Sequence, residues 1–143
     1  MQLTLYTDYT LRVLAYLSLK DPEEKATITE IAEYYDISRN HLVKVVHHLA
    51  QKGFIQTTRG KSGGIRLARP AGEINIGEVV RATEPNFNIV ECFDREKAKC
   101  VVEPACMLKP VLGEATRRFL EVLDKYTVAD IIRDGNMAVI DFQ

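Results

Sequence analysis

The sequence predicts a mainly α-helical fold with a small β-hairpin, arranged as a winged helix-turn-helix followed by a long dimerisation helix. Two amphipathic helical patterns joined by a short turn predict the helix-turn-helix, and two β-forming runs around a Gly-rich turn predict the wing. The length of 143 residues, with 46% hydrophobic and 27% charged residues, is typical of one globular domain with a small appendage. We therefore divide the chain into a winged helix-turn-helix domain over 1–84, a cysteine-bearing loop over 85–109, a dimerisation helix over 110–126, and a C-terminal helix and tail over 127–143.

The helices of the first domain each have their own sequence pattern. An apolar run over 11–19 predicts a first helix that is buried on most sides. Thr27 and Glu30 form a capping-box pattern at the start of a second helix. Ser38 is a suitable N-cap for a third helix, which ends at Gly53. The apolar residues of the second and third helices recur at helical spacing: Ile28, Ile31, Ala32, Tyr35, Leu42, Val45, Val46 and Leu49.

A hairpin is expected directly after the third helix. Residues 54–58 are rich in β-forming side chains, residues 59–64 include three glycines, and residues 65–68 form the second strand. A basic hairpin in this place is typical of a wing. Arg59 and Lys61 at its tip are then positioned to contact phosphates or the minor groove of DNA.

The distribution of charge is more informative than the net charge of −1. No Asp or Glu occurs over 37–72, although this stretch holds seven of the 19 Lys and Arg and all three His. The remaining residues carry 12 basic and 20 acidic side chains. A basic block within an acidic chain predicts a polyanionic partner, double-stranded DNA. Chance clustering on a solvated face is the alternative.

The third helix has a polar face opposite its apolar stripe, and such a helix fits a major groove with its N-terminal residues nearest the bases. This polar face consists of Asn40, His41, Lys44, His47, His48 and Gln51. The residues that we expect to contact DNA are Thr29, Ser38, Arg39, Asn40, His41, Lys44, Arg59 and Lys61.

The three cysteines of the chain, Cys92, Cys100 and Cys106, lie in a segment without hydrophobic periodicity. Their C-x7-C-x5-C spacing lacks the close pairs of a structural zinc site and suits an iron–sulfur cluster, which prefers thiolate ligands. A fourth ligand is not evident nearby. From the residues alone, Asp8 is a first-turn helix residue that pairs with Arg12. Three small buried hydrophobic residues are the alternative interpretation of the cysteines.

A helical stripe after Pro110 predicts a helix over 110–126. Its members are Leu112, Ala115, Thr116, Phe119 and Leu123. A small winged domain has little core for such a helix to cover, so we expect it to pair in a homodimer, with packing on the chain's own core as the alternative. Thr127 and Asp130 then predict the capped start of a short last helix, which Gly135 ends.

The sequence disfavours a membrane protein and an enzyme. No apolar run reaches the ~18 residues that a membrane span needs, and the first residues lack the basic region of a signal peptide. We therefore expect a cytoplasmic protein with no membrane partner. Nothing in the sequence orients a Cys–His pair for nucleophilic catalysis.

Several stretches together resemble the family of winged-helix iron–sulfur transcription regulators, and within it the nitric-oxide-sensing branch. The resemblance covers nearly the whole chain, and its strongest stretches are 1–3, 6–12, 38–45, 59–67, 104–106, 108–109 and 123–130. It implies a repressor of nitrosative-stress genes that binds a near-palindromic operator as a homodimer and releases it in response to nitric oxide.

The resemblance also implies one iron–sulfur cluster per subunit, held by Cys92, Cys100 and Cys106. The fourth ligand in this family can come from the first helix of the other subunit, where this sequence has Asp8. The first cysteine gap, seven residues, is longer than is usual in the family. We expect a 4Fe–4S cluster, with a 2Fe–2S cluster as the alternative. The alternatives are a regulator of the same fold that senses cluster supply, iron or redox state, and a zinc-stabilised DNA-binding adaptor.

Overall fold

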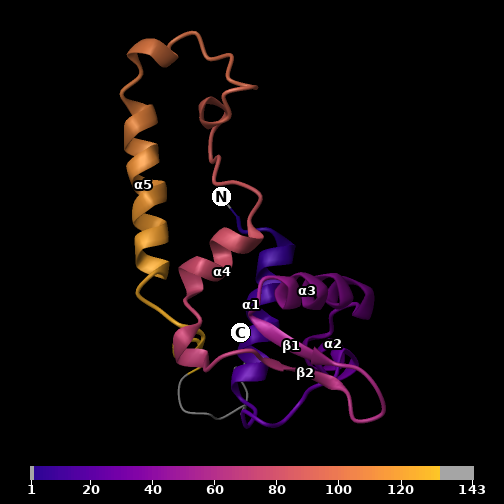
Figure 1. The fold of residues 1–143 in the computed structure, drawn as a ribbon. Coiled ribbons are helices and arrows are strands. Elements are labelled where there is room, and N and C mark those ends of the chain that lie inside the picture. The colour runs from indigo at the N-terminus through magenta and orange to yellow at the C-terminus, as the bar shows by residue number, and fades with distance from the viewer. Residues whose placement is uncertain (1, 133–143) are drawn as a thin grey trace.

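The computed structural model describes residues 2–132, and its first helices form the expected helix-turn-helix core (Figure 1). Helix α1 spans Leu5–Ser18, α2 spans Ile28–Tyr35, and α3 spans Arg39–Gln51. The pair α2 and α3 is joined by a short turn in which Asp36 has the left-handed φ of 52°. Both α1 and α2 pack against α3. The predicted helix-turn-helix is therefore confirmed.

Side-chain caps explain where the first two helices begin. The Thr4 side chain accepts a hydrogen bond from the backbone N–H of Thr7 at the start of α1. At α2, Thr27 and Glu30 form both hydrogen bonds of the predicted capping box. These side chains satisfy backbone N–H groups that have no partner within their own helix. The local sequence thus sets the start of each helix.

The predicted wing is a two-stranded antiparallel hairpin of β1 (Ile55–Thr58) and β2 (Gly64–Leu67). The register pairs Ile55 with Leu67 and Thr58 with Gly64. Its turn depends on glycine, because Gly60 has φ 104° and a Cβ at Gly63 would lie 2.4 Å from the carbonyl oxygen of Thr58. The hairpin projects away from the helices with its turn at the free end (Figure 1).

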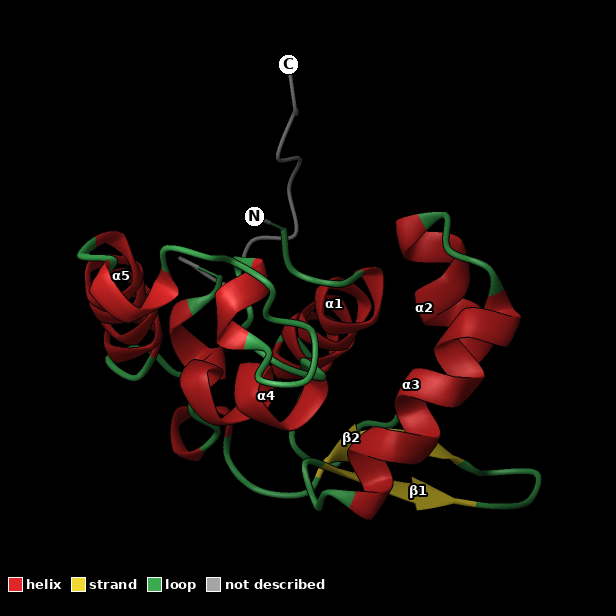
Figure 2. Ribbon diagram, turned by 90° about the horizontal axis from the view of Figure 1, so that it is seen from above, coloured by secondary structure: helices red, strands yellow, loops and turns green. Residues whose placement is uncertain are grey.

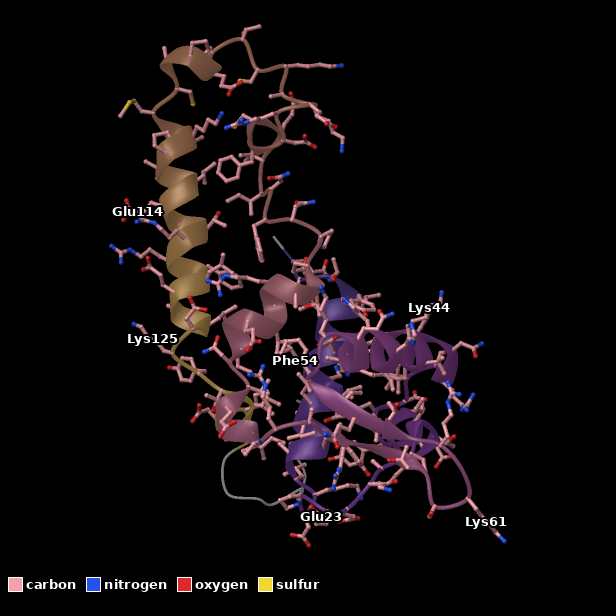
Figure 3. All side chains as sticks on the ribbon, in the orientation of Figure 1. Glu23, Lys44, Phe54, Lys61, Glu114 and Lys125 are labelled. Atoms are coloured by element: carbon pink, nitrogen blue, oxygen red, sulfur yellow. The ribbon has the colours of Figure 1, made fainter. Side chains whose placement is uncertain are left out.

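The core lies where the three helices, the base of the hairpin and α4 (Ile76–Thr83) meet. Phe54 is 2% exposed and lies at the centre of the molecule (Figure 3). Val128 also belongs to this core, although it comes from the segment after the last long helix. It is fully buried, and its backbone N–H donates to the carbonyl oxygen of Ile74. The C-terminal part of the described chain therefore packs against the winged domain.

The long helix α5 spans Leu108–Leu123, so it begins two residues before the predicted range and ends three residues before its end. Pro110 falls in the first helical turn, where its missing N–H costs nothing. None of the residues in α5 is buried. The helix stands beside α4, on the side away from α3 and the hairpin (Figure 2).

Helix α4 and the end of α5 are joined by a charged contact. The guanidinium of Arg81 donates to both carboxylate oxygens of Asp124, at 2.5 and 2.8 Å. A Cβ at Gly77 would lie 1.9 Å from Asp124 Oδ1, so glycine in α4 makes room for this carboxylate. The ion pair raises the pKa of Arg81 and lowers that of Asp124.

The last predicted helix is a single 3₁₀ turn, Val128–Asp130, in the described part of the chain. Thr127 and Asp130 form the predicted capping box. The predicted end at Gly135 lies outside the described residues. Between α4 and α5 the chain forms only short 3₁₀ turns, as expected from its lack of periodicity. Across residues 2–132, none of the helices combines the length and apolar content needed to cross a bilayer.

Candidate DNA-binding surface and cysteine segment

The N-terminal half of α3 presents an exposed polar surface. Ser38, Arg39, Asn40, His41 and Lys44 are all exposed. Ser38 occupies the N-cap position, but its side chain makes no capping hydrogen bond, so the hydroxyl is available for another partner. Thr29 in the first turn of α2 is exposed as well. These are the side chains that a helix-turn-helix would direct at a major groove.

Ion pairs divide the seven basic residues of the acid-free stretch into two groups. Arg66 pairs with Glu23 at 2.9 Å, and Arg69 pairs with Glu78 at 2.8 Å. Both pairs lie near the base of the hairpin. The other five basic residues form no ion pair within residues 2–132, and they are Arg39, Lys44, Lys52, Arg59 and Lys61. The unneutralised charge is therefore on α3, just after it, and in the turn of the wing.

The wing and α3 present this charge on the side of the molecule away from α5. In Figure 3, Lys44 points outward from α3 and Lys61 extends from the tip of the hairpin. Arg59 is exposed in the same turn. Two separate basic elements on one side can contact the groove and the adjacent backbone of one duplex.

The C-terminal half of α3 differs from the sequence prediction at one position. His48 is half-buried, and its Nδ1 forms a 2.6 Å hydrogen bond with Tyr6 Oη of α1. It therefore faces α1 and does not belong to the exposed polar face. The helical period could not reveal this, because His48 lies at the edge between the two faces and α1 covers that edge.

The three cysteines lie between α4 and α5, outside the winged core. Cys92 and Cys106 are half-buried, Cys100 is exposed, and all three thiols are free. The segment that holds them extends beyond the N-terminal end of α5, remote from the hairpin (Figure 1). An ion pair between Glu103 and Lys109 connects this segment to the first turn of α5 and raises the pKa of Lys109.

Asp8 lies in the first turn of α1 and pairs with Arg12 at 2.8 Å, as its spacing predicts. Its side chain is 40% exposed, which leaves it accessible to a further partner. Among residues 2–132 of one chain, no three His, Cys, Asp or Glu side chains are grouped closely enough to hold a metal ion. One chain alone thus does not bring Asp8 and the cysteines together.

The fold and this surface define a winged helix-turn-helix transcription regulator that binds DNA. The family model Rrf2, described as an iron-dependent transcriptional regulator, matches residues 3–134. The chain therefore belongs to the Rrf2 family.

Two relatives support this assignment over nearly the full length of the chain. The HTH-type transcriptional regulator NsrR of Bacillus subtilis is 55% identical over 134 residues, which cover 94% of this chain and 92% of the relative. The protein of the same name from Geobacillus kaustophilus is 52% identical and covers 94% of this chain and 91% of its own length. The chain is thus an NsrR-like member of the family.

Solved structures support the fold alone, because their sequences are distant. CymR, the global cysteine regulator of B. subtilis, has a TM-score of 0.75 at 24% identity and covers 93% of this chain and 99% of its own. IscR of T. potens has a TM-score of 0.75 at 23% identity, with 95% and 89% of the two chains covered. The predicted winged-helix class is therefore confirmed.

Proposed function

We propose that the chain is a homodimeric repressor that senses nitric oxide through an iron–sulfur cluster and then releases the operator DNA of nitrosative-stress genes. The observation that carries this proposal is the separation of two features. An unneutralised basic surface lies on α3 and the wing, and three free thiols lie in a segment outside the winged core. The resemblance to the nitric-oxide-sensing branch supplies the effector.

The donor set suits such a cluster. Cys92, Cys100 and Cys106 provide three free thiols, and soft thiolate ligands are those that iron–sulfur clusters prefer. We assign the fourth position to Asp8 of the partner subunit. The resemblance implies a ligand from the first helix of the other subunit, and Asp8 at that position is 40% exposed. When bound, the cluster supplies iron atoms with which nitric oxide reacts, and a carboxylate is their most readily displaced ligand.

The chain's own residues then connect this site to DNA. While Asp8 is engaged by the partner subunit, α1 of one protomer is tied to the cysteine segment of the other. That tie fixes the spacing of the two α3 helices, which a near-palindromic operator requires to be about 34 Å. On release, Asp8 returns to Arg12, with which it pairs in the free chain. A 100-fold loss of affinity needs only about 2.7 kcal/mol of coupling between the two sites.

We propose that α5 forms the dimer contact. Its exposed apolar residues recur at a spacing of three and four, which makes a stripe along one side of the helix. The stripe consists of Leu108, Val111, Ala115 and Val122, with Arg118 between the last two. The neighbouring, half-buried side of α5, with Leu120 and Leu123, packs against the chain's own core. A second copy would cover the exposed stripe.

The test is DNA binding by chain prepared without oxygen, using a labelled duplex selected from a random pool by the iron-loaded chain. We expect stoichiometric nitric oxide gas to lower the affinity about 100-fold. Undiminished binding after the cluster absorbance has changed would refute nitric oxide sensing. Substitution of Asp8 by Ala should change the resonance Raman spectrum of the loaded chain, and an unchanged spectrum would remove Asp8 from the site.

The second candidate is a regulator of the same fold that responds to iron or cluster supply. The description of the family as iron-dependent favours it. It predicts that removal of iron releases the duplex, whereas nitric oxide has no separate effect on the loaded chain. Elemental analysis for iron, sulfide and zinc distinguishes both candidates from a zinc-stabilised adaptor.

A further inference from the structure

The first turn of α1 contacts two other helices through neighbouring residues. The Tyr6 hydroxyl bonds to His48 in α3, and the Thr7 hydroxyl donates to Thr83 Oγ1 at the end of α4. Asp8 points to neither of them and remains 40% exposed beside Arg12. A displacement of Asp8 by a binding partner would therefore move a helical turn that is hydrogen-bonded to both α3 and α4.

Helix α1 and helix α4 act as one body at this end. The backbone N–H and the hydroxyl of Thr4 both donate to Glu84 Oε1, at 2.8 and 2.9 Å. The bond from Thr7 to Thr83 is buried, where a hydrogen bond is costly to break. The first turn of α1 therefore cannot shift without α4.

The contact between Tyr6 and His48 is of a different kind from the rest of the packing between α1 and α3. Most of that interface is apolar, with Val13, Leu42 and Val46 in the core, and apolar contacts are non-directional. The Oη–Nδ1 distance of 2.6 Å indicates a short hydrogen bond, and hydrogen bonds constrain angle as well as distance. This bond fixes how far α3 is turned and shifted along α1.

A second contact lies toward the other end of α3. The rings of Tyr9 and His41 have centroids 6.1 Å apart and planes inclined by 32°. His41 precedes His48 by seven residues, or about 10 Å along a helix. The Tyr9 hydroxyl makes no hydrogen bond to any residue of 2–132, so this contact depends on the ring alone.

We propose that the Tyr6–His48 hydrogen bond is the positioning contact through which the site at Asp8 sets the orientation of α3. This proposal rests on the proposed function, because it names the route between the metal site and the DNA-binding helix. Tyr6 and His48 act as positioning residues: neither needs to touch metal or a base. With the bond in place, a tie between Asp8 and the partner subunit holds α3. Without it, α3 is held to α1 only by packing that permits sliding.

The decisive variant is Tyr6→Phe, which removes one hydroxyl and retains the ring. Its matched control is Tyr9→Phe, which removes a hydroxyl without a hydrogen bond. Each variant is compared with the wild-type chain in iron and sulfide content and in the ratio of duplex affinities between the iron-loaded and metal-free forms. We expect Tyr6→Phe to load normally and to lower this ratio at least fivefold, whereas Tyr9→Phe changes it less than twofold. An unchanged ratio in Tyr6→Phe would overturn the proposal.

Substitutions at His48 test the pair from the other side. His48→Asn keeps a hydrogen-bonding atom near the position of Nδ1, and we expect it to retain most of the wild-type ratio. His48→Leu removes that atom and should behave as Tyr6→Phe does. In the His48→Leu background, Tyr6→Phe should have no additional effect, since the two residues act through one bond. Additive losses would show that they act separately and would overturn the proposal.

A measurement on the metal-free chain separates this proposal from the proposed function. Amide hydrogen exchange in the C-terminal half of α3 should become faster in Tyr6→Phe than in Tyr9→Phe, because one restraint on α3 is lost. Equal exchange in the two variants would overturn the positioning role. If the wild-type chain binds DNA equally well with and without iron, the proposed function fails, whatever the exchange shows.

Discussion

Single side chains determine which charges on the surface are available to DNA. Arg66 and Arg69 belong to the acid-free stretch of sequence, yet each is paired with a carboxylate from outside it. Glu23 comes from the loop before α2 and Glu78 from α4. Sequence alone places all seven cations together, whereas tertiary contacts neutralise the two nearest the base of the wing. The surface of unpaired positive charge is therefore smaller than the sequence suggests, because it lacks Arg66 and Arg69.

Substitution of Val128 by Ala should lower the free energy of unfolding by about 2 kcal/mol, since it removes two buried carbons and leaves a cavity. Val128 is fully buried, although it follows the exposed helix α5. The measurement is urea denaturation. The control is the same substitution at Val43, which is 40% exposed, where we expect little change. Equal effects at the two sites would contradict the placement of Val128 in the core.

Glu30 should make stability depend on pH in the acid range. Hydrogen bonds from Tyr16 at 2.7 Å and from Lys20 hold the pKa of Glu30 below its ordinary value of 4.5. Burial, together with the hydrogen bond to Glu30, raises the pKa of Tyr16 to about 12. Because the unfolded chain takes up this proton at higher pH, the stabilisation is complete above about 4.5. It is lost as the pH falls through the pKa of the folded chain.

The variant Glu30→Gln should therefore show a flatter fall in unfolding free energy between pH about 5 and about 3 than the wild-type chain. Urea midpoints across this range provide the measurement. Glu33→Gln is the control, because Glu33 is an exposed carboxylate of the same helix without an ion pair in the described chain. A variant at Glu30 with the wild-type slope would mean that the bonds from Tyr16 and Lys20 do not persist in solution.

At the scale of elements, the winged domain was predictable because its signals are local. The capping box at Thr27, the glycines of the hairpin turn and the apolar spacing of α3 are each set within a few residues. The contacts that connect elements were not predictable in this way. The bond from Tyr6 to His48 joins residues 42 positions apart, and that from Arg81 to Asp124 joins residues 43 apart. The hydrophobic periodicity of the sequence does not indicate such long-range pairs. The two tyrosines near Asp8 in the sequence, Tyr6 and Tyr9, were the only available sign that this turn contacts another helix.

The wing should contribute phosphate contacts. The double variant Arg59→Ala with Lys61→Ala removes two unpaired cations from each subunit, so in a homodimer the slope of log affinity against log salt should become shallower by about 4. Fluorescence anisotropy at several salt concentrations measures this slope. Arg66→Ala is the control, because Arg66 lies in the same hairpin and is paired with Glu23. An unchanged slope in the double variant would show that the wing does not contact DNA.

At the scale of the whole molecule, the candidate site could be predicted only in part. The sequence predicts Cys92, Cys100 and Cys106 as the ligand set, but it does not place them relative to Asp8. The structure describes one chain, in which these groups do not converge within residues 2–132. A site that a second copy completes leaves one sign in the sequence, which is an apolar stripe that the described part of the chain does not cover. On α5 this exposed stripe lies beside the half-buried face, and the apolar spacing of the sequence does not distinguish the two.

The dimer proposed on α5 gives the last prediction. Val111 and Val122 are 61% and 50% exposed, and a carboxylate at either would have to be buried in a paired helix. Val111→Glu with Val122→Glu should therefore produce a monomer by sedimentation velocity. A monomer occupies one half-site, so its affinity for the full duplex should fall at least 100-fold while the fold is retained by circular dichroism. Arg117→Glu, at an exposed position of α5 outside this stripe, should remain dimeric. If the double variant sediments as a dimer, the two copies associate through a surface other than this stripe, and Asp8 must be brought to the cysteines of the partner subunit by a different arrangement.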